Sequence, residues 1–170
     1  MSYDVNYLEN LENLENIEFK KTNNNISLVN YRGKKIKFCL ENIYIPFGLE
    51  KYKFNMKFKY FLKINLSQEL YEIFSNFEDY VCKKVFKLYG KNYKIKSQLE
   101  KRNTHNLLIL KIKEFRNKLL SKIIDKEGCN ISIFEITSKL YANIIISPNI
   151  YINNNEIIIK WTIETINITR

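Results

Sequence analysis

The most regular pattern in the chain is an alternation of apolar and basic residues over a predicted strand at residues 53–66. Its odd positions carry lysines around a single phenylalanine: Lys53, Lys57, Lys59, Phe61 and Lys63. The even positions are apolar throughout. Because side chains alternate faces along a strand, the lysines and Phe61 are expected on the face opposite the core. Cations bind phosphates and exposed rings stack on bases, so this face predicts a surface for single-stranded nucleic acid.

Two later segments repeat this alternation. The predicted strand at 107–113 ends in lysines that an arginine soon follows, and in the predicted strand at 137–146 a lysine and a tyrosine share one face. The residues concerned are Lys111, Lys113, Arg116, Lys139 and Tyr141. If the three strands are neighbours in the sheet, these side chains extend the basic face of 53–66 into a continuous groove.

The lysines also have a plainer interpretation. The 170-residue chain has a formal net charge of +10 at pH 7. Asn, Lys, Ile and Tyr are all frequent and have AT-rich codons, so an AT-rich genome would raise the lysine content without any polyanionic partner. Lysine on an edge strand also protects a protein against aggregation. The positions of the charged residues, rather than the net charge, therefore have to decide between nucleic-acid binding and an effect of composition.

Acidic residues are concentrated at the start of the sequence. Residues 1–19 contain five acidic residues and no lysine or arginine. Leu or Ile recurs at every third position from Leu8 to Ile17, a spacing that drifts around an α-helix. We therefore expect an acidic, flexible N-terminal arm over residues 1–25 and a nucleic-acid-binding domain over residues 26–170.

Short runs of alternating residues, separated by turns, make up most of this domain. They predict strands at residues 26–31, 35–45, 53–66, 107–113, 130–136, 137–146, 150–152 and 156–168. Ser67 is a good N-cap and Gly90 a natural C-terminal stop for one long helix, while residues 114–126 are expected to be helical or irregular. The predicted fold class is mainly β with one long helix (α+β), as a barrel or sandwich with an inserted helix.

Residue types that perform catalysis are sparse. His105 is the single histidine, and the four glycines form no phosphate-binding motif. Glu78 and Asp79 are adjacent on the predicted helix, where neighbours point about 100° apart, so we interpret them as a solvated helix face. Trp161 shares a strand face with isoleucines and is expected in the core. The sequence predicts a protein that is not an enzyme, with no catalytic residue, metal or cofactor.

The cysteines and the hydropathy pattern indicate the compartment. Cys39, Cys82 and Cys129 are odd in number and far apart, which fits neither a disulfide framework nor a zinc site. No run of 18 apolar residues and no secretory signal is present, so no membrane association is expected. We expect an intracellular, reducing environment.

Two segments resemble a known family. NIYIPFGLEKY at 42–52 leads into an amphipathic strand and a helix, and PNIYINNNEIIIKWTIETINI at 148–168 forms a strand, a polar turn and an aromatic-containing strand. Both are similar to the phage-T7-type single-stranded DNA-binding proteins of nucleocytoplasmic large DNA viruses. The resemblance implies an OB-fold-like barrel, non-catalytic binding of single-stranded DNA in replication, recombination or repair, and replication proteins as partners. For a viral protein it implies the host cytoplasm, in a viral factory, or the nucleus.

The resemblance has one departure, and the function has one rival. Family members often carry an acidic C-terminal tail, whereas this sequence ends Ile168-Thr169-Arg170 and has its acidic stretch at the front. Either the arm takes the same electrostatic role or such a tail is absent. The rival is a viral structural or adaptor protein that uses the same sheet for protein contact. The sequence leaves open a homodimer and the choice between DNA and RNA.

Overall fold

The structure, a computed structural model, describes residues 17–22, 25–30, 36–54, 57–102, 104–115, 118–153 and 155–169. Most of these residues form β-strands, and a single long helix, α1, spans Gln68–Tyr89 within the described ranges. The strands are β1 Ile17–Thr22, β2 Asn25–Asn30, β3 Phe38–Ile45, β4 Leu49–Phe54, β5 Lys57–Leu66, β6 Lys94–Lys96, β7 Leu99–Lys101, β8 Asn106–Ile112, β9 Glu114–Phe115, β10 Lys118–Leu119, β11 Lys122–Ile124, β12 Leu140–Asn153 and β13 Glu156–Ile168, with a 3-10 helix, η2, at Ile133–Glu135. The predicted class, mainly β with one long helix, is confirmed.

The central strands form a closed ring. The pairing order runs β12-β3-β5-β8-β13, and β12 also pairs with β13, which returns the path to its start. Apolar side chains point into this ring, among them Leu62 and Ile64 of β5 and Leu110 of β8, all fully buried. This arrangement is consistent with the OB-like fold expected from the sequence. The side of the ring strands that points away from this core is called the outer face.

Helix α1 begins and ends at the predicted residues. The Ser67 hydroxyl accepts a hydrogen bond from the Leu70 N–H at 3.1 Å, and Gly90 ends the helix in the left-handed region with φ 64°. The helix buries Phe74 and Phe77 against Trp161 of β13, with ring centroids 4.8 and 5.3 Å apart. Trp161 is 0% exposed, so its predicted core position is confirmed. In the described parts of the chain, no helix combines the length and apolarity needed to cross a lipid bilayer.

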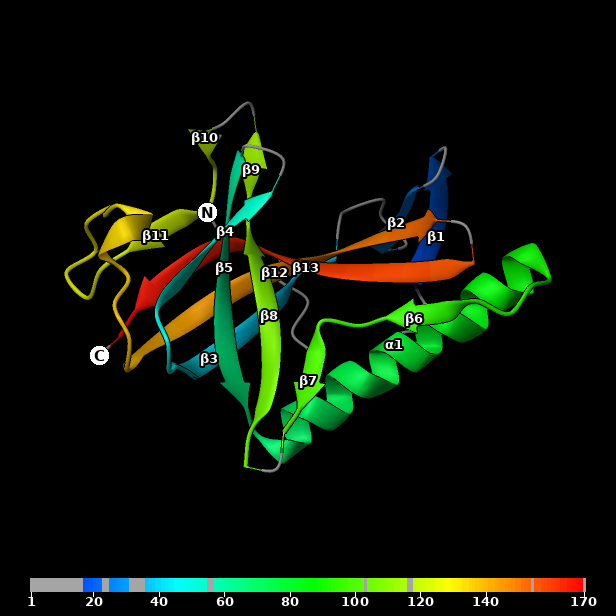
Figure 1. Cartoon of the computed structure of the whole chain (residues 1–170), viewed down its shortest axis with the longest axis horizontal. Helices are drawn as coiled ribbons and strands as arrows, with labels where there is room; N and C mark the ends of the chain where they lie inside the picture. The colour runs from blue at the N-terminus through cyan, green and yellow to red at the C-terminus, as the bar shows by residue number, and fades with distance from the viewer. Residues whose placement is uncertain are drawn as a thin grey trace.

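Strands β12 and β13 extend beyond the ring as a long antiparallel hairpin. Figure 1 shows α1 and β6 on one side of this hairpin and the β1–β2 hairpin on its other side. Strand β2 pairs with β12 at Ile26↔Ile150 and Asn25↔Tyr151. Strand β1 therefore lies within the segment predicted as an acidic arm, whereas residues 1–16 lie outside the described residues.

The run at 53–66, predicted as one strand, is two. Strands β4 and β5 fold back on each other so that Phe54 pairs with Lys57 and Lys53 pairs with Phe58. Directly opposite residues of an antiparallel pair share a face. Lys53 therefore lies on the face of Phe58, opposite that of Lys57, and its predicted place beside the other lysines is wrong. The prediction for Lys53 assumed that side chains alternate faces along one unbroken strand, which fails where the chain folds back between β4 and β5.

Three predicted strands and one predicted helical or irregular segment after residue 113 also differ from the structure. Within residues 130–136, Ile133–Glu135 form the 3-10 helix η2, which Ser132 and Glu135 cap reciprocally, because a capping box favours a helical turn over a strand. The strands predicted at 137–146 and 150–152 are the single strand β12, which continues through Pro148 with a register shift after Ile145. The segment 114–126, expected to be helical or irregular, contains the short strands β9, β10 and β11.

Candidate nucleic-acid interface

Phe61 and Lys111 meet on the outer face as directly opposite residues. The antiparallel pairing of β5 with β8 places Phe61 across from Lys111. The parallel pairing of β8 with β13 places Lys111 beside Thr162, and Thr162 lies opposite Ser147 on β12. Residues of four strands therefore form one row across the outer face, with the Phe61 ring and the Lys111 cation partly exposed and the hydroxyl residues Thr162 and Ser147 buried. The strands predicted to carry Phe61 and Lys111 are neighbours, as a shared surface requires.

Lys160 lies at the centre of a group of cations on this face. It is two residues before Thr162 on β13 and so projects from the same side. The pKa of Lys160 is lowered, first because the group is partly buried and then by the charges of Lys111, Lys59 and Lys96. We call these four residues, Lys59, Lys96, Lys111 and Lys160, the lysine cluster. Cations that repel one another in this way favour the binding of an anion between them.

Tyrosines border the lysine cluster on two sides. The Lys160 Nζ lies 5.3 Å from the centroid of the Tyr151 ring on β12. Tyr52 of β4 pairs with Lys59 of β5, shares its face and is 64% exposed. Rings beside cations are the combination on which bases of a single strand can stack while its phosphates are neutralised.

Other lysines of the outer face are neutralised by acids. The Lys113 Nζ lies 2.7 Å from Glu164 Oε2, and the Ser147 hydroxyl donates to Glu164 Oε1 at 2.9 Å. Burial tends to raise the pKa of Glu164, but the bonds from Lys113 and Ser147 outweigh it and lower the pKa, so Glu164 stays charged. Lys63 is paired with Glu50 at 2.9 Å. Both lysines, which are predicted to contact nucleic acid, are ion-paired within the fold.

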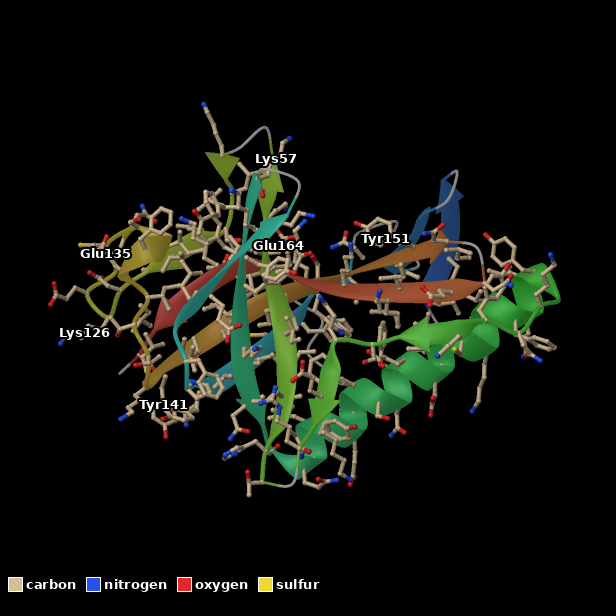
Figure 2. The ribbon with its side chains drawn as sticks, in the orientation of Figure 1. Lys57, Lys126, Glu135, Tyr141, Tyr151 and Glu164 are labelled. Carbon is tan, nitrogen blue, oxygen red and sulfur yellow. The ribbon has the colours of Figure 1, made fainter. Side chains whose placement is uncertain are left out.

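The remaining predicted residues are spread more widely. Lys57 is exposed near the end of the β4–β5 hairpin, whereas Arg116 lies outside the described residues. Lys139 precedes β12 with φ 62°, so it does not share a strand face with Tyr141 as predicted. Tyr141 packs against Tyr44 of β3 with ring centroids 5.1 Å apart. Figure 2 shows Tyr141 at the lower left, well away from Tyr151, which borders the lysine cluster.

Sequence reasoning missed Lys160, Lys96, Tyr52 and Tyr151. Lys160 could have been found, because it alternates with Trp161, which was assigned to the core, and so must point outward. Lys96 could not, since its strand has only three residues and gains its place by pairing in parallel with β13. Tyr52 and Tyr151 become relevant only through Lys59 and Lys160, their partners on neighbouring strands.

Glu78 corrects the interpretation of the Glu78–Asp79 pair as a solvated helix face. Its side chain is 6% exposed, and the Ser97 hydroxyl donates to its Oε1 at 2.8 Å. Burial is the main reason that the pKa of Glu78 is raised to about 7; the charge of Asp79 adds to the rise and the hydrogen bond from Ser97 opposes it. The Trp161 Nε1–H makes no hydrogen bond of normal geometry. Within the described ranges, no group of histidine, cysteine and acidic residues could hold a metal ion.

The fold is similar to those of solved single-stranded DNA-binding proteins. The protein of bacteriophage Enc34 in complex with ssDNA aligns with a TM-score of 0.57 and 11% identity over 88% of this chain and 92% of that chain. A C-terminal truncation of the same phage protein aligns with a TM-score of 0.56 and 11% identity over 89% of this chain and 92% of that chain. A further structure of the phage protein aligns with a TM-score of 0.58 and 10% identity over 90% of both chains. No protein-family model and no curated protein sequence matches the chain. At these identities the likeness is one of fold, and it covers nearly the whole of both chains.

Proposed function

We propose that the protein binds single-stranded DNA on the outer face of β5, β8 and β13, without catalysis. The observation that carries this proposal is the lysine cluster, whose four cations come from four strands that the sheet pairing brings together beside the tyrosines of the outer face. The fold shared with phage proteins that bind single-stranded DNA supports the same function. The finer proposal is a role in replication, recombination or repair, with replication proteins as partners, in a phage-T7-type protein of a large DNA virus.

The mechanism follows from the chemistry of the face. Phosphates of the strand would displace counterions from the lysine cluster, which gives affinity without reading sequence. Phe61, Tyr52 and Tyr151 would stack on bases, which a duplex keeps inside its own helix. Because every base has a flat aromatic face, this contact tolerates any sequence.

Titration of the full chain with fluorescent oligo-dT at several salt concentrations tests the proposal. Neutralisation of a phosphate by each member of the lysine cluster predicts that log K falls with log [salt] with a slope of about −3, since each contact contributes about −0.7 on single strands. A duplex of the same length should bind more weakly. Affinity that does not change with salt, or no DNA binding together with a stable complex with another protein, would contradict the proposal and favour an adaptor role.

A further inference from the structure

The β4–β5 hairpin has a second solvent-exposed face beyond the core. Leu49 and Leu62 are paired, and Leu62 is fully buried. Further toward the turn, the same face carries the pairs Lys51–Tyr60 and Lys53–Phe58. Phe58 is 44% exposed, because the hairpin extends past the apolar interior that covers Leu62. This face lies opposite the one that carries Tyr52, Lys57 and Lys59.

Rings and cations are interleaved on this second face. The Lys51 Nζ lies 3.7 Å from the centroid of the Phe58 ring. Tyr60, two residues along β5, meets Phe134 of η2 edge to face, with centroids 5.4 Å apart and planes at 79°. Phe134 is 63% exposed. Rings from distant parts of the sequence therefore form one exposed aromatic strip beside Lys51 and Lys53.

The charge of this strip indicates what it binds. Large exposed apolar side chains gathered in one place mark an interaction site. At protein–protein interfaces aromatic residues are enriched but lysine is depleted, whereas surfaces for single strands combine the two. Glu135 is adjacent to Phe134, but its Oε1 accepts a hydrogen bond from the Ser132 N–H, which holds it in the cap of η2. A polyanion with exposed flat bases fits this strip better than an apolar protein surface.

The two faces of the hairpin meet at its end. Lys57 projects on the outer face and pairs with Phe54, while the next residue, Phe58, projects on the second face opposite Lys53. A flexible strand that follows Lys59 and Lys57 outward therefore reaches Phe58 by passing over this end.

We propose that Phe58 and Phe134, with Lys51 and Lys53, form a second stacking site for the single strand bound at the lysine cluster. The strand continues from the outer face over the end of the β4–β5 hairpin and places further bases on these rings. This inference rests on the proposed function and extends it to the path and length of the bound strand.

Oligo-dT of graded length separates the two sites. The variant Phe58→Ala with Phe134→Ala removes rings that are already solvent-exposed, and Phe86→Ala on α1, 48% exposed, is the matched control. Short oligonucleotides that occupy only the lysine cluster should bind the double variant as tightly as the unaltered protein. Longer ones should bind at least about tenfold more weakly, and the occluded site should shrink by about two nucleotides, one for each ring lost. The Phe86→Ala variant should match the unaltered protein at every length.

Two results would overturn this inference. The first is that the double variant loses the same affinity for oligonucleotides of every length. The second is that it loses no affinity at any length, which would also be the result if Phe58 bound a protein partner and not DNA. If the double variant does not keep the circular dichroism spectrum of the unaltered protein, Lys51→Gln with Lys53→Gln takes its place and must show the same dependence on length. Failure of the unaltered protein to bind any oligonucleotide would instead refute the proposed function itself.

Discussion

Neighbouring residues of β13 lie in two very different regions of the molecule. On its inner face, Trp161 is fully buried against Phe38, Phe74 and Phe77 and joins the sheet to helix α1. On its outer face, Lys160 lies among other lysines, and its pKa is lowered first by partial burial and then by their charges. The inner face stabilises the fold with apolar contacts, while the outer face holds charges together against their repulsion. Under the proposed function, alternation along one strand separates the residues that stabilise the fold from those that bind DNA, so stability and affinity should each change without the other.

The largest effect is expected on the inner face. Trp161→Ala removes a fully buried ring and leaves a cavity beside Phe74 and Phe77, so the free energy of unfolding should fall by about 3–5 kcal/mol. Urea denaturation followed by circular dichroism measures this. A loss below about 1 kcal/mol would mean that the contact between β13 and α1 does not stabilise the fold.

The buried carboxyl group of Glu78 on α1 should make the stability of the fold depend on pH. Its pKa of about 7 in the fold, against 4.5 ordinarily, means that folding favours the neutral form. Its contribution to stability is therefore complete below pH 4.5, falls as the pH rises toward 7 and stays low above it. Glu78→Gln should remove up to about 3 kcal/mol of this fall. Urea denaturation of the unaltered protein and of the Glu78→Gln variant at pH 5 and pH 8 measures the change. If the free energy of unfolding fell equally in both proteins, the role of Glu78 would be contradicted. At a single pH, the two proteins should bind oligo-dT with the same affinity.

Phe61 provides the reciprocal test on the outer face. Phe61→Ala should weaken oligo-dT binding by about 1–3 kcal/mol, the value of one stacked base. Its ring is only partly buried, so the free energy of unfolding should change by less than about 1 kcal/mol. Fluorescence titration and urea denaturation of the same preparation measure the two quantities. Lost stability with unchanged binding would place Phe61 in the inner region after all.

The smallest effect is expected where the outer face is already neutralised. Lys113→Gln with Glu164→Gln removes an ion pair without a change of net charge. Because Lys113 is held by Glu164 rather than by phosphate, the salt slope of oligo-dT binding should be unchanged and the affinity should alter by less than about 0.5 kcal/mol. A slope shallower by about 0.7 would show that Lys113 contacts a phosphate in the complex.

Features set by a few neighbouring residues could be predicted from the sequence. Ser67 and Gly90 bound α1 because capping depends on local backbone geometry. The outward face of Phe61 and the inward face of Trp161 follow from alternation within one strand. The neighbouring placement of Phe61 and Lys111 needed the pairing of β5 with β8, which sequence alone does not give.

Features set by contacts between distant segments could not be predicted. The face of the sheet on which Lys53 lies depends on the chain reversing direction between β4 and β5, where the sequence has no glycine or proline to indicate a reversal. The neutralisation of Lys113 depends on Glu164, 51 residues away, and the burial of Glu78 depends on Ser97. Whether a lysine on the outer face of a strand is held in an ion pair thus depends on its cross-strand neighbours.

The most direct test of the lysine cluster compares Lys160→Glu with Lys126→Glu in oligo-dT titrations over a range of salt concentrations. Both variants change the net charge equally, but Lys126 is exposed in a turn at the far end of the molecule (Figure 2). We predict that Lys160→Glu weakens binding at least about tenfold and makes the salt slope shallower by about 0.7 or more, because a phosphate contact is lost. Lys126→Glu should leave the slope unchanged. Equal effects of the two variants would contradict the account, since binding would then follow total charge and not the lysine cluster.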